Sequence, residues 1–326
     1  MTDFTANPFR SPVFLDRHAA GAGDLRDEIV HGLLATPATI APKHFYDPLG
    51  SALFAAICLT DEYYPTRTEA VLLAAHGAAI ARAIGPDACL IDLGAGDCAK
   101  AAGLFDRLRP ARYLALDISV EYLRDSLGAL ARRYPAIAMA GIGTDFSSQL
   151  DLGGQASAER RWFFYPGSSI GNFDPAQSRA FLARLREQTD PQGGLLIGID
   201  LVKPQPVLDA AYNDALGVTA AFNRNVLRHL NRLVGSDFEI GQWDHRAFYD
   251  PRHGRIEMHL EAREPVTVRW PGGARSWQAG ERIHTENSWK FTLAGFEAIL
   301  RDAGFRLDQA WRDERDWFAL VLARPV

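Results

Sequence analysis

The clearest chemical signal in the sequence is a glycine-rich segment at residues 92–100, DLGAGDCAK, which follows an apolar run and precedes a helix-like stretch. Glycines let the backbone approach a ligand closely, and the start of a helix offers free N–H groups. We therefore predict a nucleotide-binding turn in which Gly94, Gly96 and Lys100 are the candidate cofactor ligands. Two chemistries compete for such a turn: hydride transfer with a dinucleotide and methyl transfer from S-adenosylmethionine (SAM).

Acidic and aromatic residues after the next two predicted strands distinguish these chemistries. Asp117 ends the next strand, where a carboxylate can accept hydrogen bonds from ribose hydroxyls of either cofactor. Asp145 and Phe146 follow the third strand, and an acid beside an aromatic ring can hold adenine by its amino group and its face. No tyrosine lies four residues before any of the four lysines, so the Tyr/Lys pair of short-chain reductases is absent. The sequence therefore favours SAM, although both aspartates could instead cap helices.

Alternating helix-like and apolar segments between residues 68 and 202 must position these groups. The periodicity predicts helices at 69–84, 100–108, 120–133 and 175–187, and strands at 89–93, 113–117, 136–142, 161–164 and 195–200. Repeated units of this kind imply a parallel sheet covered by helices on both faces. We therefore predict an α/β fold with a Rossmann-like sheet.

The chain on either side of this region differs in character. Residues 1–24 predict an irregular lead-in, and a short helix follows at 24–34. Residues 209–234 predict one long helix, and segments 246–249, 256–262 and 266–270 alternate as antiparallel strands would. A helix at 292–303 and a strand at 317–323 suit a return to the first sheet. We therefore predict a SAM-binding domain at 68–202 plus 291–326, and a smaller α+β substrate domain at 1–67 plus 203–290.

Composition limits the class of protein. The 326 residues carry a net charge of −5, which gives no general attraction to nucleic acid or to an anionic membrane. No apolar run reaches the ~18 residues of a membrane span, and the start of the chain lacks a signal pattern. Three cysteines and nine histidines show no metal-binding spacing. We expect a cytoplasmic monomer that acts on a small molecule, with no metal, nucleic-acid or membrane partner.

Five clusters outside the glycine-rich segment are richer in polar and aromatic residues than packing requires. They lie at residues 42–47, 62–67, 166–173, 211–214 and 284–291. The cluster at 166–173 follows the fourth predicted strand, and the carboxyl end of a parallel strand faces the ligand crevice. These clusters are the candidate substrate side of the site.

The clusters closely resemble those of the histidine Nα-methyltransferases of ergothioneine biosynthesis. The resemblance runs from about residue 41 to the end and rests on segments 45–47, 62–67, 167–173, 200–203, 217–225, 255–258 and 285–291. It implies the fold of class I SAM-dependent methyltransferases with a smaller substrate domain. It also implies three successive methylations of the α-amine of L-histidine, which give hercynine (Nα-trimethylhistidine).

The resemblance also implies roles for individual residues at the substrate's two ends. Asn172 and Tyr212 match the residues that clamp the substrate carboxylate. Glu286 and Ser288 match those that bind the imidazole, and Met258 matches a position that lines the imidazole pocket. An imidazole has two ring nitrogens, so a carboxylate can accept from one N–H while a hydroxyl serves the other nitrogen.

Three further positions match residues around the reacting amine. Tyr63 matches a partner of the amine, Tyr46 an aromatic face beside the methylated nitrogen, and Gly167 a backbone carbonyl near the amine. Tyr46 and Tyr63 are therefore the candidate catalytic residues. Tyrosine faces suit a nitrogen that becomes a quaternary cation, because cation–π attraction survives when methyl groups replace N–H donors.

Other interpretations remain open from the sequence alone. The chain could methylate a related amino acid or an indole amine, although an indole offers only one N–H to Glu286 and Ser288. It could also be a catalytically idle SAM-binding protein. The tyrosines could pack between domains, Ser288 could cap an element, and Met258 could be simple core. Asn287 and Trp289 replace small or aliphatic residues of some family members, which puts in doubt how the imidazole pocket is lined.

Overall fold

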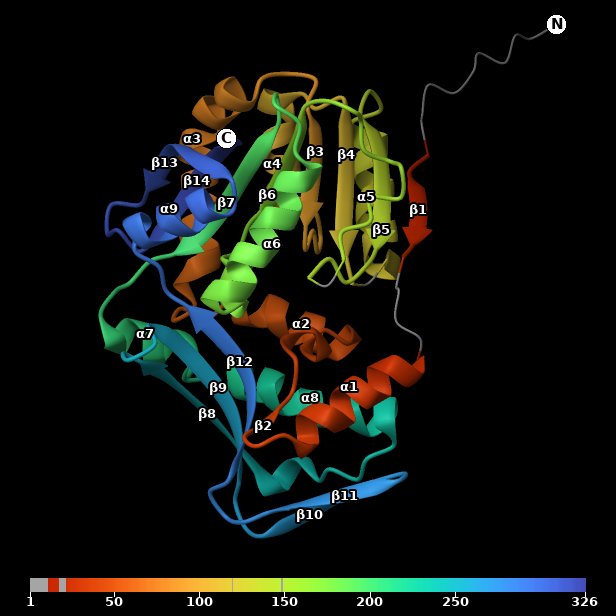
Figure 1. Cartoon of the computed structure of the whole chain (residues 1–326), viewed down its shortest axis with the longest axis vertical. Helices are drawn as coiled ribbons and strands as arrows, with labels where there is room; N and C mark the ends of the chain where they lie inside the picture. The colour runs from red at the N-terminus through yellow and green to blue at the C-terminus, as the bar shows by residue number, and fades with distance from the viewer. Residues whose placement is uncertain (1–10, 18–21, 119, 148) are drawn as a thin grey trace, which may run out of the picture.

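The computed structural model describes residues 11–17, 22–118, 120–147 and 149–326. An eight-stranded sheet, with strand order β1-β5-β4-β3-β6-β7-β14-β13, forms the upper half of the molecule in Figure 1. The pairs are parallel from β1 to β7, whereas β14 pairs antiparallel with both β7 and β13. The strands are β1 (Val13–Asp16), β3 (Cys89–Leu93), β4 (Arg112–Asp117), β5 (Ala138–Gly143), β6 (Arg161–Tyr165), β7 (Gly194–Asp200), β13 (Phe305–Arg312) and β14 (Phe318–Pro325).

Helices cover both faces of this sheet. On one face pack α3 (Tyr64–Ile84), α4 (Ala99–Leu108) and α5 (Val120–Arg133), and on the other α6 (Pro175–Gln188) and α9 (Leu293–Asp302). Every residue of β3 and β7 is buried, as expected for strands that are covered on two faces. The predicted α/β fold with a Rossmann-like sheet is therefore confirmed.

A smaller sheet lies below the large one, with strand order β2-β12-β9-β8. Its strands are β2 (Ala38–Thr39), β8 (Trp243–Asp250), β9 (Arg255–Ala262) and β12 (Arg282–Trp289), and a hairpin of β10 (Val266–Trp270) and β11 (Gly273–Trp277) lies beneath it. A separate apolar core joins this sheet to neighbouring helices. These are α1 (Ala22–Leu34), α2 (Pro48–Ile57), α7 (Gln205–Ala211) and α8 (Val218–Val234), with short 3-10 turns η1 (Pro42–Phe45) and η3 (Ile240–Gln242).

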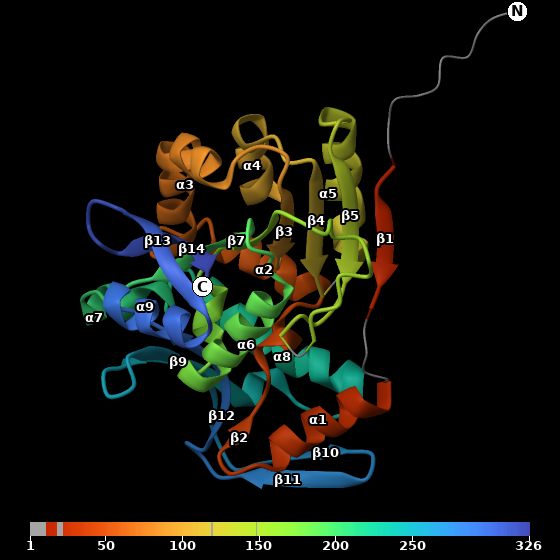
Figure 2. The same ribbon diagram turned by 45° about the horizontal axis from the view of Figure 1, so that its top comes forward.

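The strands of the large sheet point toward this second core. In both Figure 1 and Figure 2 the arrowheads of β3, β4 and β5 are directed toward α2 and α8. The turns that follow these strands therefore open toward the smaller sheet and its helices. Among the described residues, no helix is both long and apolar enough to cross a membrane.

Two predicted segments differ from the structure. The lead-in contains a strand, β1, which pairs with β5 of the large sheet; its four residues are too few for a clear periodic pattern. The predicted helix at 209–234 is two helices: α7 ends at Ala211, and α8 begins at Val218, directly after Gly217, which adopts φ +75°. The Asp214 carboxylate then accepts hydrogen bonds from the N–H groups of Val218 and Thr219 at the start of α8. This break leaves Tyr212 at the end of α7.

Candidate functional site

The glycine-rich turn joins β3 to α4 at the carboxyl edge of the large sheet. Gly94 and Gly96 adopt φ values of +72° and +53°, a region in which a residue with a Cβ is strained. A Cβ on Gly96 would meet no other atom within 4 Å, so the turn borders open space there. The Gly96 N–H donates to Asp117 Oδ2 at 3.0 Å, which ties the turn to the end of β4.

The acid–aromatic pair follows β5 beside the same turn. The Phe146 ring lies 3.8 Å from the position that a Cβ on Gly94 would take. Asp145 accepts from the Ser147 N–H at 3.1 Å, and Lys43 Nζ lies 3.2 Å from its Oδ2. Burial raises the pKa of Asp145, but these contacts outweigh burial and hold the pKa below its usual value. Asp145 is therefore ionised and able to accept a hydrogen bond from an amino group.

These groups fit an adenosyl ligand. Asp117 ends β4, where ribose hydroxyls can donate to a carboxylate, while Asp145 and Phe146 offer an acceptor and an aromatic face for adenine. The glycines leave room for a ligand close to the backbone. The chemistry of this set of donors and acceptors thus suits SAM.

Glu69 links this cofactor edge to the substrate side, and sequence reasoning missed it. Its side chain is fully buried on α3, where its Oε2 accepts from Lys100 Nζ at 2.6 Å. Its Oε1 accepts from the Gly167 N–H at 2.8 Å. Lys100, predicted to bind the cofactor, therefore lies at the junction between the glycine-rich turn and the loop after β6. A single acid in the largely apolar stretch 69–75 was the signal available in the sequence.

One pocket gathers every residue predicted for the substrate side. Its lining includes Tyr46, Tyr63, Gly167, Asn172, Tyr212, Met258, Glu286 and Ser288. These residues come from clusters far apart in the sequence, and the fold brings them together below the carboxyl edge of the large sheet. Sequence reasoning missed other lining residues, among them Phe54 and Phe222, because each lies on a helix whose apolar residues also build the core.

A close backbone approach joins two of these segments. Asn172 ends η2 (Ser169–Asn172), the 3-10 turn after β6. A Cβ on Gly171 would lie 3.0 Å from the Trp289 carbonyl oxygen and 3.7 Å from Ser288 Oγ. Because glycine has no Cβ, η2 packs directly against β12. This contact sets Asn172 beside Ser288.

Strand pairing arranges the imidazole candidates. Glu286 lies opposite Met258 in the antiparallel pair of β12 and β9, directly after a register shift between His284 and Glu286. Glu286 and Ser288 are two residues apart and share one face of the strand, the face that lines the pocket. Asn287 and Trp289 alternate with them and are not part of the pocket lining. Asn287 and Trp289, which differ from the residues of some family members, therefore do not themselves line the pocket.

Aromatic rings form one wall of the pocket. The Tyr46 ring packs edge-on against Phe54 and Phe222 at centroid distances of 5.8 and 5.9 Å. The Tyr63 ring does the same with Phe54 and Tyr212, each at 6.2 Å. Burial, followed by nearby negative charge or other tyrosines, raises the pKa of Tyr46 and Tyr63. Both phenols therefore keep their protons and act as donors and aromatic faces rather than as bases.

Comparison with known proteins agrees with this arrangement. A model of the family described as "Histidine-specific methyltransferase, SAM-dependent" matches residues 25–325. The chain is 40% identical to a histidine N-alpha-methyltransferase of Mycolicibacterium smegmatis, over 93% of this chain and 96% of that protein. It belongs to the SAM-dependent, histidine-specific methyltransferase family.

Two further relatives are similar over most of this chain. A histidine N-alpha-methyltransferase of Mycobacterium tuberculosis is 38% identical, over 93% of this chain and 96% of that protein. Ergothioneine biosynthesis protein 1 of Neurospora crassa is 28% identical, over 86% of this chain and 32% of that longer protein. As a member of this family, the chain is a SAM-dependent methyltransferase.

Glu286 is the carboxylate among the described residues that line this methyltransferase's pocket. Burial raises its pKa to about 7, and the positive charge of Lys290 offsets only part of that effect. A ligand N–H that donates to this buried carboxylate stabilises its charged form, because the hydrogen bond replaces part of the solvation that burial removed.

The raised pKa of Glu286 predicts a pH-dependent cost in stability. A carboxyl whose pKa is higher in the folded state than in the unfolded state destabilises the fold as pH rises from about 4.5 to about 7. We therefore expect ligand-free Glu286→Gln to melt a few °C above the wild-type protein at pH 8, and to melt at the same temperature near pH 4. Thermal unfolding of both proteins across this range measures the difference. A difference in melting temperature that stays constant with pH would contradict the raised pKa of Glu286.

Glu257, His259 and His284 also lie within metal-ligand distance of one another in the methyltransferase. Several of their side-chain atoms already bond one another or the backbone, although the buried Nδ1 of His259 has no hydrogen-bond partner among the described residues. His259 Nε2 lies 2.9 Å from Glu257 Oε2, and His284 Nε2 lies 3.0 Å from the Glu286 carbonyl oxygen. Arg255 pairs with the remaining oxygen of Glu257. A hydrogen-bonded cluster on the smaller sheet accounts for this group.

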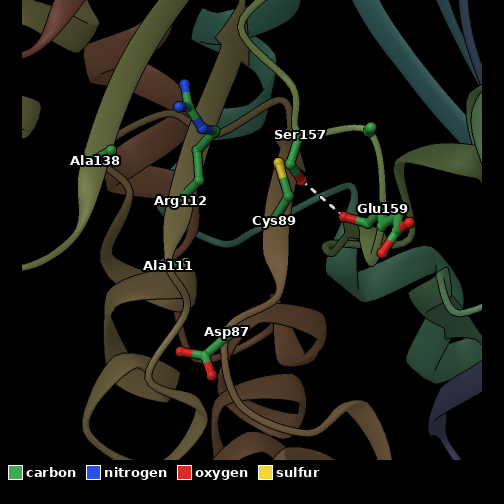
Figure 3. A pocket seen from close by; sticks show the side chains of 8 residues that line it. Asp87, Cys89, Ala111, Arg112, Ala138, Ser157 and Glu159 are labelled. Carbon is green, nitrogen blue, oxygen red and sulfur yellow. Dashed lines mark hydrogen bonds between the residues drawn. The ribbon is translucent and has the colours of Figure 1, made fainter.

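A second hollow lies at the opposite edge of the methyltransferase's large sheet. Figure 3 shows side chains from the starts of β3, β4 and β5 and from the loop before β6. Among its lining residues are Cys89, Arg112, Ser157 and Glu159, and Ser157 Oγ donates to the Glu159 carbonyl oxygen at 2.7 Å. Since these are the amino ends of the parallel strands, this hollow is on the far side of the sheet from the glycine-rich turn.

Proposed function

We propose that this protein transfers three methyl groups from SAM to the α-amine of L-histidine, giving hercynine for ergothioneine biosynthesis. One observation carries the proposal: the eight residues that correspond to the family's histidine site line one pocket. The pocket also adjoins the cofactor edge, because Glu69 bonds both Gly167 and Lys100. We assign the cofactor to Gly94, Gly96, Lys100, Asp117, Asp145 and Phe146.

We assign the substrate's carboxylate and its imidazole to two neighbouring groups of residues in the pocket, which meet where the Tyr212 hydroxyl donates to Ser288 Oγ. The amide of Asn172 and the hydroxyl of Tyr212 bind the carboxylate, and Glu286 and Ser288 bind the imidazole above Met258. This arrangement would leave the α-amine near the Gly167 carbonyl, between Tyr46 and Tyr63. The aromatic packing of these rings and their retained phenol protons support it.

The bound donor supplies an electrophilic methyl group, and the chain's residues position the amine lone pair for in-line attack. The amine must lose a proton before each transfer. Because an α-amine has a pKa of roughly 7.7–8.0, water removes that proton without a strong base. Tyr63 orients the amine, and the face of Tyr46 stabilises the cation as methyl groups replace N–H donors.

We further propose the remaining features of the enzyme. Residues 68–202 and 291–326 form the SAM-binding domain, and residues 1–67 and 203–290 form the substrate domain, apart from β1, which lies in the large sheet. We propose a cytoplasmic monomer that binds no nucleic acid and no membrane. Its net charge of −5 supports this assignment.

Product analysis tests the proposal directly. We expect the protein, incubated with SAM and the twenty amino acids, to convert histidine alone to a product that carries three added methyl groups. Mass spectrometry of the mixture identifies the product and any partly methylated intermediates. Methylation of tryptophan or another amino acid in preference to histidine would instead favour the related N-methyltransferase activity. No methylated product with any of them would contradict the proposal.

A further inference from the structure

A buried lysine stands directly behind the substrate pocket. Lys290 follows the last residue of β12, and no part of its side chain is exposed. Its Nζ lies 2.9 Å from Asp200 Oδ2 and donates to Ser288 Oγ at 2.7 Å. It also lies 3.4 Å from the Tyr212 hydroxyl. Lys290 therefore contacts two of the hydroxyls that face the substrate without itself lining the pocket.

A second buried lysine provides the contrast. Lys203 Nζ lies 2.5 Å from the other oxygen of Asp200 and donates to the Tyr64 hydroxyl at 2.8 Å. Burial lowers the pKa of Lys203 to about 8, whereas attraction to Asp200 outweighs burial at Lys290 and raises its pKa. The two lysines thus share one carboxylate. Lys290 has the higher pKa, and of the two it is the one that contacts the hydroxyls of the pocket.

The hydrogen bonds on Ser288 fix the direction of its own proton. A hydroxyl has one proton to donate and two lone pairs to accept with. Ser288 Oγ accepts from Lys290 Nζ at 2.7 Å and from the Tyr212 hydroxyl at 2.8 Å. Both lone pairs are therefore occupied, and its proton remains for a ligand in the pocket that Ser288 lines.

When the substrate binds, Lys290 still donates its hydrogen bond to Ser288. If Tyr212 turns its proton to the substrate carboxylate, Ser288 still accepts from the ammonium. A positive charge 2.7 Å behind Ser288 also disfavours a ring N–H directed at that hydroxyl. The charge of Lys290, which stays in place when Tyr212 turns away, therefore selects an unprotonated ring nitrogen at Ser288, and Glu286 accepts from the ring N–H.

We propose that Lys290 is a positioning residue for the imidazole: it holds Ser288 as a hydrogen-bond donor, so that the site takes the neutral ring. This inference rests on the proposed function, since it takes histidine as the substrate. The proposal gives the buried ion pair of Lys290 and Asp200 a role in substrate binding in addition to its place in the fold. A buried pair is by itself weak support for stability, because desolvation offsets most of the attraction.

Matched variants test the role. We expect Lys290→Met to raise the KM for histidine roughly 10- to 100-fold, with a smaller fall in kcat, because Ser288 loses its fixed donor direction. Lys203→Met removes the other partner of the same carboxylate and serves as the control. It should leave the KM for histidine within roughly threefold of the wild-type value. Equal effects of the two variants on KM would reduce Lys290 to a structural role.

A double-mutant cycle provides a measurement that does not depend on differences in stability between the variants. If Lys290 acts through Ser288, Lys290→Met should change the affinity for histidine by less than roughly threefold in a Ser288→Ala background. Calorimetry with the demethylated cofactor bound measures these affinities, and thermal unfolding confirms that each variant is folded. Additive effects of the two substitutions would overturn the proposal.

A spectroscopic test needs only the wild-type protein, so it holds even if Lys290→Met does not fold. Histidine labelled with ¹⁵N in the ring is bound at a pH at which the free ring is half protonated. We expect one protonated and one unprotonated ring nitrogen in the bound state. Two protonated nitrogens would overturn the inference about Lys290. Failure of histidine to bind or react at all would instead contradict the proposed function.

Discussion

We expect Glu286→Ala to abolish most histidine turnover and to leave SAM binding intact. The side chain lines the pocket opposite Met258 and has no role at the glycine-rich turn. If Glu286 binds the imidazole as proposed, its loss leaves the ring N–H without that acceptor in a buried pocket. A buried polar site discriminates against an unmatched partner by several orders of magnitude. We expect kcat/KM for histidine to fall by roughly two to four orders of magnitude, as measured by initial-rate kinetics.

Two comparisons make this result specific. SAM affinity, measured by calorimetry, should stay within roughly threefold of the wild-type value. Glu257→Gln changes a nearby carboxylate that bonds Arg255 and His259 instead of the pocket, so it serves as the matched control. Near-wild-type turnover of histidine by Glu286→Ala would exclude Glu286 as the imidazole acceptor.

We expect Asp117→Ala to give the opposite pattern and to weaken SAM binding. Asp117 ends β4 and accepts from the Gly96 N–H at 3.0 Å, so its carboxylate both fixes the turn and faces the cofactor edge. Loss of hydrogen bonds to a charged group corresponds to a rise in the Kd for SAM of roughly 10- to 100-fold. Calorimetric titration with SAM measures the change.

Substitutions nearby separate the two roles of Asp117. Asp117→Asn keeps one oxygen for Gly96 but removes the charge, so we expect an intermediate loss of SAM affinity. Asp97→Ala alters another carboxylate of the same turn, one that accepts from the Ala99 N–H, and should have the smaller effect. An unchanged Kd in Asp117→Ala would remove this residue from the ribose site.

Periodicity predicted β3, β4, β5, β6, β7 and β14 of the large sheet, because each is a nearly continuous apolar run between turn residues. It missed β13, which carries polar and charged residues along its length. The elements it missed have weak local patterns. The strand β1 has four residues, and β12 carries the polar run around Glu286, which reads as a loop. The predicted helix at 209–234 is interrupted between Ala211 and Val218, and the prediction missed this break because helical apolar spacing continues across it. In each case a tertiary contact or a cap, rather than local periodicity, determines the element.

The sequence by itself determined the cofactor turn and the chemical identity of the substrate groups. A turn is a local structure, so Gly94, Gly96 and their neighbours specify it within one segment. The remote residues gave a weaker signal: Asn172, Tyr212 and Glu286 lie in clusters that are richer in polar and aromatic residues than packing requires. Resemblance to one family then gave these residues their predicted roles.

Only the tertiary structure decided how these groups act together. The joint role of Glu69 on Lys100 and Gly167 depends on α3 packing between the glycine-rich turn and the loop after β6. The contact of Lys290 with Ser288 matters because Asp200, from a different sheet, holds the ammonium in a buried place. Spacing along a chain does not encode burial or the direction of a hydroxyl proton. Burial and the direction of a hydroxyl proton both depend on which segments lie next to one another in the folded chain, and the packing of the whole fold determines those neighbours.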